Sequence, residues 1–311
     1  MQHGADACTI GGTVRHPAGE RVIQVRIQPP EKSLALFGKT ITIDEFVGQL
    51  HVTAFTQAHL AVIRGSPADR RAFLDRGMMT IYPGHVRAVV NYTKALKHRN
   101  RLLCEGRIGT GALLNEEQLD SWDQILAGEG AQVIWNRLQY VDELKAHLPE
   151  GLFGDEHVRM QYLCSVKGSG SSVGALREGF GHALKQARAA DARAGHTSIG
   201  PHREDVRIFV DSRMVSTFGS AGQQRSALLA LYFAQLEVHK CRCGFYPIFL
   251  VDDVEAELDD ERLKRFISYL GERTQTLLTT AKQKALPEMS GEISRLAVES
   301  GGIIREIQPE I

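Results

Sequence analysis

Apolar and polar residues alternate over the first part of this chain. Between residue 11 and about residue 56, short stretches such as RVIQVRI (21–27) and KTITI (39–43) alternate in this way, with glycine and proline between them. Successive side chains of a β-strand point to opposite faces of a sheet, so this period predicts antiparallel strands.

Beyond Gly65-Ser66-Pro67 the pattern changes to a helical period. Residues at helical spacing, most of them apolar, run from Val86 to Leu103 and again from Trp122 to Leu148. A further helical run ends near Asp191, after a glycine- and serine-rich stretch at 167–174. These segments predict an arm built of helices.

Strand and turn residues return at VRIFVDSRMV (206–215), so the order along the chain is β, then helices, then β and α together. This order predicts an α/β fold in which a helical arm interrupts one head. The predicted parts are an antiparallel β part of the head over 1–66, the arm over 67–191 and the rest of the head over 192–311.

Composition narrows the class of protein. The 311 residues are 43% apolar, and 37 lysines and arginines balance 37 acidic residues, so any contact with nucleic acid must come from local basic clusters. No apolar run is long enough for a bilayer and the first residues do not resemble a leader, so we expect a cytoplasmic protein without a membrane partner. The five cysteines are scattered, as in reduced proteins. Cys241 and Cys243 lack a second ligand pair, so the sequence does not predict a zinc site.

An apolar run that ends in two acids is the first candidate site. In IFLVDDVEAELDDE (248–261) the run predicts a strand buried on both faces of a parallel sheet. Asp252 and Asp253 follow it at the carboxyl end, where open α/β sheets bind ligands. One acid is suited to hold hydrated Mg²⁺ while the other polarises a water molecule. The alternative is a strand end at which Asp253 caps the next turn.

The second candidate is the start of a helix in FGSAGQQRSALLALYFAQLE (218–237). Ser220 and Gln223 have the spacing of a capping box, and Leu229, Phe233 and Leu236 predict one apolar stripe. A helix start offers unpaired N–H groups and the positive end of the helix dipole, which favour phosphate. By itself this segment is also compatible with any capped helix.

Five segments together resemble the RecF family. They are SAGQQR, LVDD and AELDDE, with TSIGPHRED (197–205) and GSPADRRAFLD (65–75), and they span residues 65–261. The resemblance implies an ABC-type ATPase head, a mixed sheet flanked by helices, interrupted by a helical arm or lid. It also implies a homodimer that uses ATP and Mg²⁺ to close on DNA at gaps or single-strand/double-strand junctions. By the same resemblance, RecR and RecO are partners in loading RecA during recombinational repair and the SOS response.

The resemblance also assigns roles to individual residues. It makes Asp252 the metal ligand, Asp253 the catalytic carboxylate and Asp259 the D-loop aspartate. Thr279 and Thr280 lie where many ABC proteins have the histidine called the switch residue. The signature that contacts the γ-phosphate of ATP held by the other subunit comprises Ser220, Gly222, Gln223, Gln224 and Arg225.

One part of the family pattern is missing from this sequence. A RecF-like protein begins with a strand, a GxNGxGKT phosphate loop and a helix, and this chain lacks them, which we interpret as an N-terminal truncation. SLALFGKT (33–40) ends like such a loop but has Ser33 at the first glycine position. A β-turn at Phe37-Gly38 is therefore the preferred interpretation. FTQAHL (55–60) also departs from the family's F-x-P-E-D-L, so Gln57 is either a Mg²⁺-sensing residue or a polar loop residue.

Candidate contacts with DNA lie on the arm and beside it. Lys94, Lys97 and Arg101 share one helical stripe, with His98 and Arg99 beside it, and a solvated helix face explains them equally well. Arg70 and Arg71, just after a turn, are also candidates for contact with DNA. The role of Gly200, Pro201, His202 and Arg203 in GPHRED is open between a structural turn with an internal ion pair and a role near the nucleotide.

Two other functions compete with the RecF-like ATPase. Without the phosphate loop, the chain is either the main part of a weak DNA-stimulated ATPase or a non-catalytic fragment that acts as a binding module. An ATP-binding subunit of a membrane transporter shares the signature and the strand with two acids. That class lacks both GPHRED and a long helical insertion, so the sequence disfavours it.

Overall fold

The computed structural model describes residues 5–106, 116–151, 156–166, 172–252, 260–271, 273–280, 294–299 and 302–306. The chain divides into two compact units. The first unit comprises residues 1–51 and 58–245, and the second comprises residues 52–57 and 246–311. Among the described residues, none of the helices combines the length and hydropathy that a bilayer span requires.

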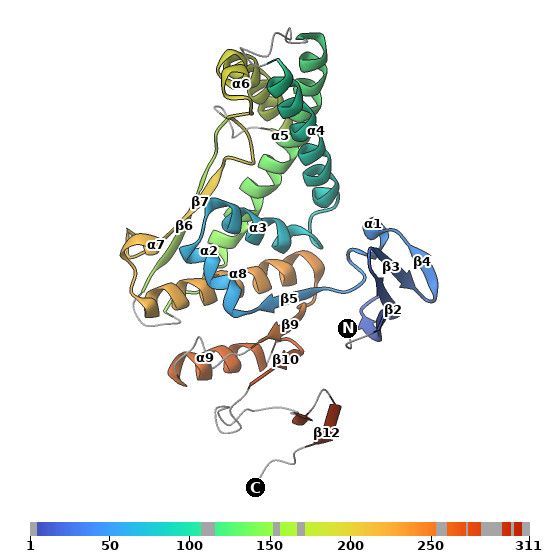
Figure 1. The fold of residues 1–311 in the computed structure, drawn as a ribbon. Helices are drawn as coiled ribbons and strands as arrows, with labels where there is room; N and C mark the ends of the chain where they lie inside the picture. Colours follow the sequence, from blue (N-terminus) through green and yellow to red (C-terminus); the bar gives the residue numbers. More distant parts are fainter. Residues whose placement is uncertain are drawn as a thin grey trace. The chain divides into compact units, whose positions relative to one another are not determined.

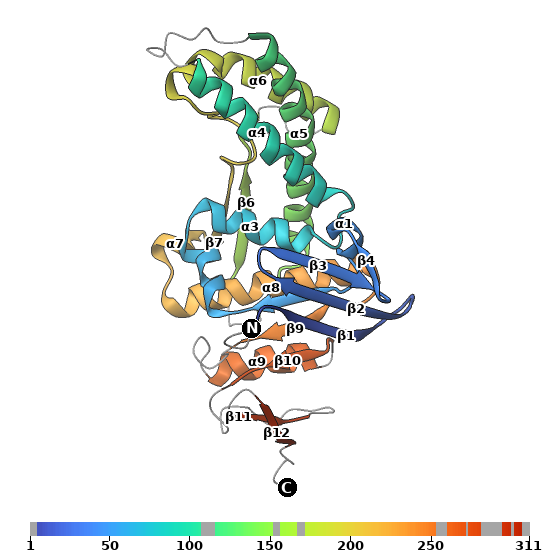
Figure 2. The ribbon, with the colours of Figure 1, turned by 45° about the vertical axis from the view of Figure 1, so that its right-hand side comes forward.

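The first unit begins with an antiparallel four-stranded sheet in the order β1-β2-β3-β4 (Figure 2). Its strands are β1 (Cys8–His16), β2 (Gly19–Gln28), β3 (Glu31–Leu36) and β4 (Lys39–Ile41). Leu36 pairs with Lys39, and the turn residues Phe37 and Gly38 have φ of 50° and 77°. Two positive φ angles are those of a type I′ hairpin turn. The turn predicted at Phe37-Gly38 is therefore confirmed, and this segment forms a hairpin in place of a phosphate loop.

The strand predicted at 39–43 is shorter than expected. β4 ends at Ile41, and Thr42 caps a short helix, α1 (Ile43–Phe46). Thr42 Oγ1 accepts from the N–H of Glu45, and the Glu45 carboxylate accepts from the N–H of Thr42. This reciprocal capping box competes with strand extension, and alternation alone does not reveal it.

Helices dominate the middle of the first unit, where α4, α5 and α6 lie side by side (Figure 1). They are η1 (Gln57–Leu60), α2 (Ala61–Arg64), α3 (Pro67–Met78), α4 (His85–Glu105), α5 (Glu116–Ala146) and α6 (Val173–Ala194). Helical spacing in the sequence matches α4, α5 and α6. Their shared core contains Tyr92, Ile134, Phe180 and Leu184, all of them buried.

The sequence places Arg99 on the basic face of the arm, either toward DNA or toward solvent, but the structure buries it completely between α4, α5 and α6. Its Nε donates to Asp123 Oδ1 at 2.6 Å, and its Nη1 donates to Asp191 Oδ2 at 2.7 Å and to Thr197 Oγ1 at 2.8 Å. Arg188 also donates to Asp123. A buried guanidinium is tolerated only when carboxylates and acceptors of this kind surround it.

The rest of the first unit is a second antiparallel sheet, a short helix and a largely buried helix. The sheet has the order β6-β7-β8, with β6 (Val158–Leu163), β7 (Asp205–Val210) and β8 (Arg213–Met214). After it come α7 (Val215–Phe218) and α8 (Ala221–Cys243). We expected α8 to bury one stripe, but every residue from Ser226 to Leu236 is buried. Helices α2, α5 and α7 and strand β7 contact α8, and the Phe73 ring of α3 packs against its Tyr232, so α8 is covered on several sides.

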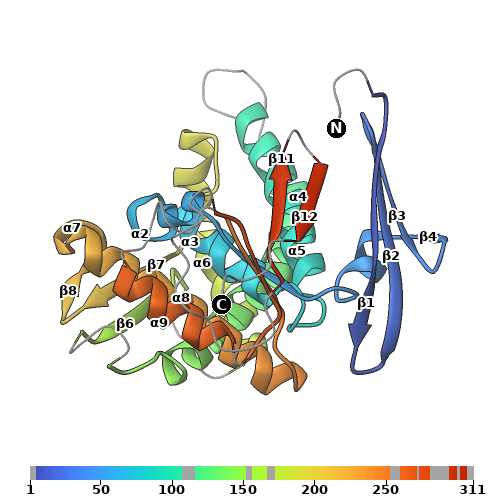
Figure 3. The ribbon, with the colours of Figure 1, turned by 90° about the horizontal axis from the view of Figure 1, so that it is seen from below.

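The second unit contains a three-stranded parallel sheet in the order β10-β9-β5. Its strands are β5 (Val52–Phe55), β9 (Ile248–Val251) and β10 (Thr276–Leu278), accompanied by α9 (Asp260–Gly271). β11 (Leu296–Glu299) and β12 (Gly302–Glu306) pair in antiparallel orientation, as Figure 3 shows. Strands that precede and follow the helical region in the sequence thus share one sheet.

Strand β9 was expected to be buried on both faces, and this expectation is wrong. Phe249 and Val251 are buried, and the Phe249 ring packs against that of Phe266 on α9. Leu250 points to the opposite face, where it remains 36% exposed beside the 54% exposed Leu277 of β10. A continuous apolar run does not by itself reveal how many faces of a strand are covered.

Candidate functional site

The capping box predicted at the start of α8 is present. Ser220 Oγ accepts from the N–H of Gln223 at 3.2 Å, and Gln223 Oε1 accepts from the N–H of Ser220 at 3.0 Å. In the first turn, the N–H groups of Ala221 and Gly222 have no acceptor within the helix. Ser220 and Ala221 are exposed, so this positively polarised helix end faces solvent.

Gln224 and Arg225 differ from Ser220 in their surroundings. The Gln224 amide donates to the carbonyl of Gly219 at 3.1 Å and accepts a short hydrogen bond from Arg64 Nε. Gln224 therefore holds the chain before α8 in place and ties it to α2. Arg225 is half-buried in the first turns of α8. Of the five signature residues, Ser220 is the exposed one, and Gly222, Gln223, Gln224 and Arg225 are all half-buried.

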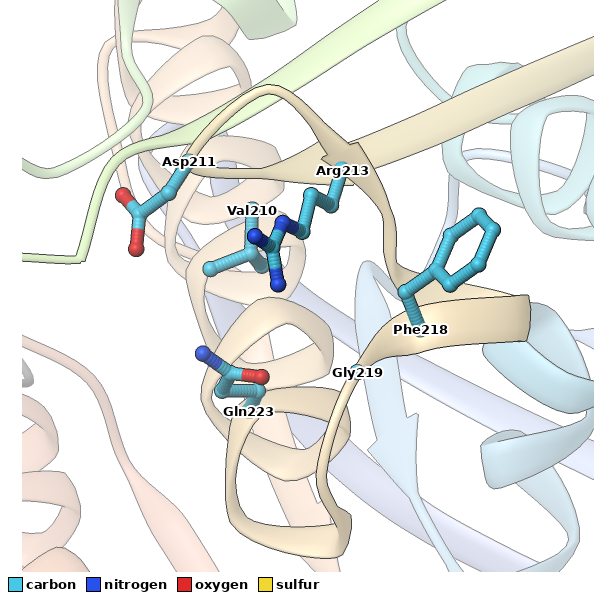
Figure 4. A pocket seen from close by; sticks show the side chains of 6 residues that line it. All are labelled: Val210, Asp211, Arg213, Phe218, Gly219 and Gln223. Carbon is cyan, nitrogen blue, oxygen red and sulfur yellow. The ribbon is translucent and has the colours of Figure 1, made fainter.

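A pocket of about 260 Å³ opens beside this helix start (Figure 4). Gln223 and Gly219 line one side, and the Arg213 guanidinium extends into the space between Val210 and Phe218. Phe218 is 67% exposed at the rim of this pocket. Sequence patterns did not single out Arg213 or Phe218, although both lie within seven residues of Ser220.

In the second unit, Asp252 and Thr279 lie together at the carboxyl ends of β9 and β10. Thr279 Oγ1 donates to Asp252 Oδ1 at 2.6 Å, and the Thr279 N–H donates to the carbonyl of Val251 at 2.9 Å. The Asp252 N–H donates to the carbonyl of Phe55, so the neighbouring strand also fixes its backbone. Asp252 itself is exposed. Thr280 follows at the end of the described segment, and Asp253 and Asp259 lie outside the described residues.

The GPHRED segment forms a buried hydrogen-bonding network. Gly200 has φ of 129°, and an added Cβ would lie 2.6 Å from Tyr92 Oη, so only glycine fits there. The Pro201 carbonyl accepts from Arg137 Nη1 at 2.7 Å. His202 Nδ1 lies 2.6 Å from Tyr92 Oη, and its Nε2 lies 3.1 Å from the carbonyl of Thr197. These contacts join the segment to α4 and α5.

The last two residues of GPHRED bind both arginines of GSPADRR, one through its side chain and the other through its backbone carbonyl. Arg70 makes a two-pronged ion pair with Asp205, at 2.7 and 3.0 Å, and Arg71 Nη1 donates to the Glu204 carbonyl at 2.6 Å. The buried Glu204 carboxylate accepts from Ser165 and from Tyr162 Oη. The two sequence motifs are therefore partners in one internal network. Arg203, in contrast, is exposed.

The basic face on α4 contains fewer of the predicted basic side chains than the sequence indicated. Lys94, Lys97 and Arg101 are exposed, and Arg101 pairs with Glu105 at 2.9 Å. His98 stacks on Trp122 with ring centroids 4.4 Å apart, and Arg99 is buried. The exposed Arg87 extends the stripe by two turns toward the start of α4.

Burial gives His202 a pH-dependent effect on stability. Desolvation lowers the pKa of His202 from 6.5 to about 4, against the hydrogen bond to Thr197. Between these pH values the unfolded chain binds more protons than the folded chain, so stability is complete above pH 6.5 and falls on acidification. At about 1.4 kcal/mol for each unit of pKa, the loss is on the order of 3 kcal/mol.

We expect His202→Gln to reduce the loss of unfolding free energy between pH 6.5 and pH 4, measured by urea denaturation at several pH values. His196→Gln, which replaces an exposed histidine six residues earlier, is the matched control and should keep the wild-type slope. A slope unchanged in His202→Gln would contradict this assignment.

The sequence of this chain is similar to those of known DNA repair proteins. No protein-family model matches the chain. The DNA replication and repair protein RecF of Exiguobacterium sp. is 32% identical over 282 residues, which cover 89% of this chain and 75% of that protein. The protein of the same name from Desulforamulus reducens is 36% identical over 266 residues, covering 83% and 70% of the two chains.

The fold of this chain is similar to that of solved structures with the same protein name. A structure of the recombination mediator protein RecF-ATP in the RecFOR pathway has a TM-score of 0.86 at 25% identity, covering 98% of this chain and 81% of the other. The corresponding RecF-ATPrS structure has a TM-score of 0.85 at 26% identity, covering 96% and 80%. The predicted α/β fold of an ABC-type head with a helical arm is confirmed. The chain belongs to the RecF family of DNA replication and repair proteins.

Proposed function

We propose that this protein is a DNA-binding ATPase of recombinational repair, in which the start of α8 contacts the triphosphate that a second copy of the protein holds. The single observation that carries the proposal is the exposed, capped helix start at Ser220 in a chain of the RecF family. Its free N–H groups and positive dipole end suit the γ-phosphate, and Arg213 in the adjacent pocket adds a positive charge.

Mg²⁺ fits the acids at the ends of the parallel strands. Within the described part of the chain, Asp252 offers a second carboxylate oxygen beside the one that accepts from Thr279, and oxygen ligands are those that Mg²⁺ prefers. In our proposal Asp253 orients the attacking water, and Asp259 acts at the interface between the two copies. Bound Mg²⁺ would neutralise the charge that develops on the transferred phosphate.

DNA is the proposed macromolecular ligand, and α4 offers the surface for it. Lys94, Lys97 and Arg101, extended by Arg87, form a row of exposed cations that suits the phosphates of one strand. Arg70 and Arg71 are not included, because their guanidinium groups already bind Asp205 and the Glu204 carbonyl. By analogy with the RecFOR pathway of the related structures, RecO and RecR are the proposed protein partners.

A pair of matched cap variants tests the role of Ser220. Ser220→Ala and Ser172→Ala each remove a side chain that accepts from the third N–H of its helix, which costs about 1 kcal/mol in either case. Only Ser220→Ala should also weaken MgATP-dependent self-association, by roughly tenfold for one lost hydrogen bond to phosphate. The protein is expressed from its own chromosomal locus and purified. Sedimentation velocity with and without MgATP then measures its self-association.

A second candidate function rests on the hairpin turn at Phe37-Gly38, which takes up the stretch of this sequence that ends like a phosphate loop. In this alternative the chain is a binding module without ATP binding of its own. Equal self-association of both cap variants and the wild type, insensitive to MgATP, would favour the binding module. Micromolar binding of MgATP that depends on Ser220 would favour the ATPase.

A further inference from the structure

Two histidines and a cysteine that are far apart in the sequence meet at the C-terminal end of α8. His239 and Cys243 are one helical turn apart on α8, so they lie on the same face. His51 approaches them from the loop between α1 and β5. One ligand atom from each of the three side chains lies within 4.8 Å of the other two.

The hydrogen bonds of the two imidazole rings determine where their protons are. His51 Nε2 lies 3.1 Å from the carbonyl oxygen of Gly48, and His239 Nδ1 lies 2.8 Å from that of Phe245. A carbonyl oxygen can only accept, so each of these nitrogens carries its ring proton. In the neutral rings, the other nitrogens are therefore bare. These two bare nitrogens, His51 Nδ1 and His239 Nε2, face each other at 2.7 Å.

Two nitrogen lone pairs at this distance repel each other unless a cation lies between them. A shared proton would place a positive charge among rings that disfavour it. Burial and the neighbouring His239 lower the pKa of His51 to about 4, and burial lowers the pKa of His239. Arg21, which donates to the Gly48 carbonyl, adds a further positive charge. A metal ion differs from a proton because it also recruits the Cys243 thiolate, whose negative charge offsets part of its own.

We propose that His51, His239 and Cys243 bind a divalent transition-metal ion, with Zn²⁺ as the expected ion and water as its fourth ligand. Two imidazole nitrogens and one thiolate form a ligand set that suits Zn²⁺. Tetrahedral Zn²⁺ with bonds of about 2.0 Å separates two nitrogens by about 3.3 Å. Binding therefore requires the rings to move apart by about half an ångström and the thiolate to move inward.

The groups around the cluster already have the arrangement that metal-binding histidines need. A histidine ligand usually donates its second ring N–H to a carbonyl or carboxylate, which fixes the ring and its tautomer. Gly48 and Phe245 accept these hydrogen bonds here. Gly48 has φ of 88°, and Arg21 donates to its carbonyl at 2.9 Å, so the loop that presents His51 is itself held in place. The metal would thus join the loop before β5 to the end of α8.

Zinc and cobalt titrations of the purified wild-type protein test the proposal. We expect one tightly bound Zn²⁺ per chain in competition with a chromophoric chelator. Co²⁺ should give a thiolate-to-cobalt charge-transfer band in the near ultraviolet. Cys243→Ser should lose this band, and both Cys243→Ser and His51→Asn should weaken Zn²⁺ binding at least tenfold.

The neighbouring cysteine provides the matched control. Cys241 is exposed, and its Sγ contacts His147 instead of the cluster, so Cys241→Ser should bind both metals like the wild type. The proposal fails if the wild type binds no stoichiometric Zn²⁺, which would leave the shared proton as the explanation. It also fails if Cys241→Ser and Cys243→Ser lose binding equally. If circular dichroism shows that Cys243→Ser does not fold, His51→Asn decides by the same tenfold criterion, because His51 lies in a loop.

Discussion

Replacement of Arg99 by alanine should lower the free energy of unfolding of the helical region by about 3 to 5 kcal/mol. The guanidinium is fully buried and compensates two buried carboxylates, Asp123 and Asp191. Its removal would leave Asp191 with only the two hydrogen bonds from Ser198. Asp123 would keep Arg188. A buried charge that loses its partner is among the most destabilising changes in a protein.

Tryptophan fluorescence can isolate this effect. Both tryptophans of the chain, Trp122 and Trp135, lie on α5, so urea denaturation followed by fluorescence reports on the helices that Arg99 joins. Arg101→Ala, two residues along α4, is the control, because its ion pair with Glu105 is exposed. The urea midpoint of the control should remain close to that of the wild type. A loss for Arg99→Ala as small as that of the control would show that the buried network contributes little.

Replacement of Asp252 by asparagine should reduce ATP turnover to background, by at least about 1,000-fold, in protein expressed from its own locus. Asparagine keeps the oxygen that accepts from Thr279 Oγ1, so the strand ends should retain their arrangement. Only the negative charge is lost, and this charge is what the proposed Mg²⁺ requires. Phosphate release in the presence of gapped DNA measures the effect.

Thr279→Val separates the charge from the hydrogen bond. This variant removes the donor at 2.6 Å but leaves the Asp252 carboxylate intact, so turnover should fall far less than in Asp252→Asn. Wild-type turnover in Asp252→Asn would remove Asp252 as the metal ligand. An equally severe loss in Thr279→Val would instead indicate that the position of the carboxylate matters as much as its charge.

The parts of this fold that local chemistry determines were predictable from the sequence. The Ser220 capping box and the Phe37-Gly38 turn each depend on residues within four positions of one another, so the pattern contains the whole interaction. The helical period of α4 and α5 is equally local. The capping box at Thr42 was equally local, but the alternation of KTITI concealed it.

Long-range partners explain what the sequence did not reveal. Arg99 lies between exposed cations on α4, and only Asp123 and Asp191, on two other helices, make its burial possible. His51 precedes His239 by 188 residues in the sequence. The residues around Cys243 therefore gave no sign that His51 lies beside them. The exposed side of β9 depends on what covers the sheet, and a run of apolar residues does not carry this information.

The pairing of β5 with β9 has a consequence for biosynthesis. Val52 lies opposite Ile248, so about 190 residues must leave the ribosome before β5 finds its neighbour. At roughly 5 to 20 residues per second, the nascent strand waits for on the order of 10 to 40 seconds before it can pair with β9. Such late, non-local closure slows folding and exposes the strand to aggregation. Newly made chains should therefore depend on chaperones until residue 251 has emerged.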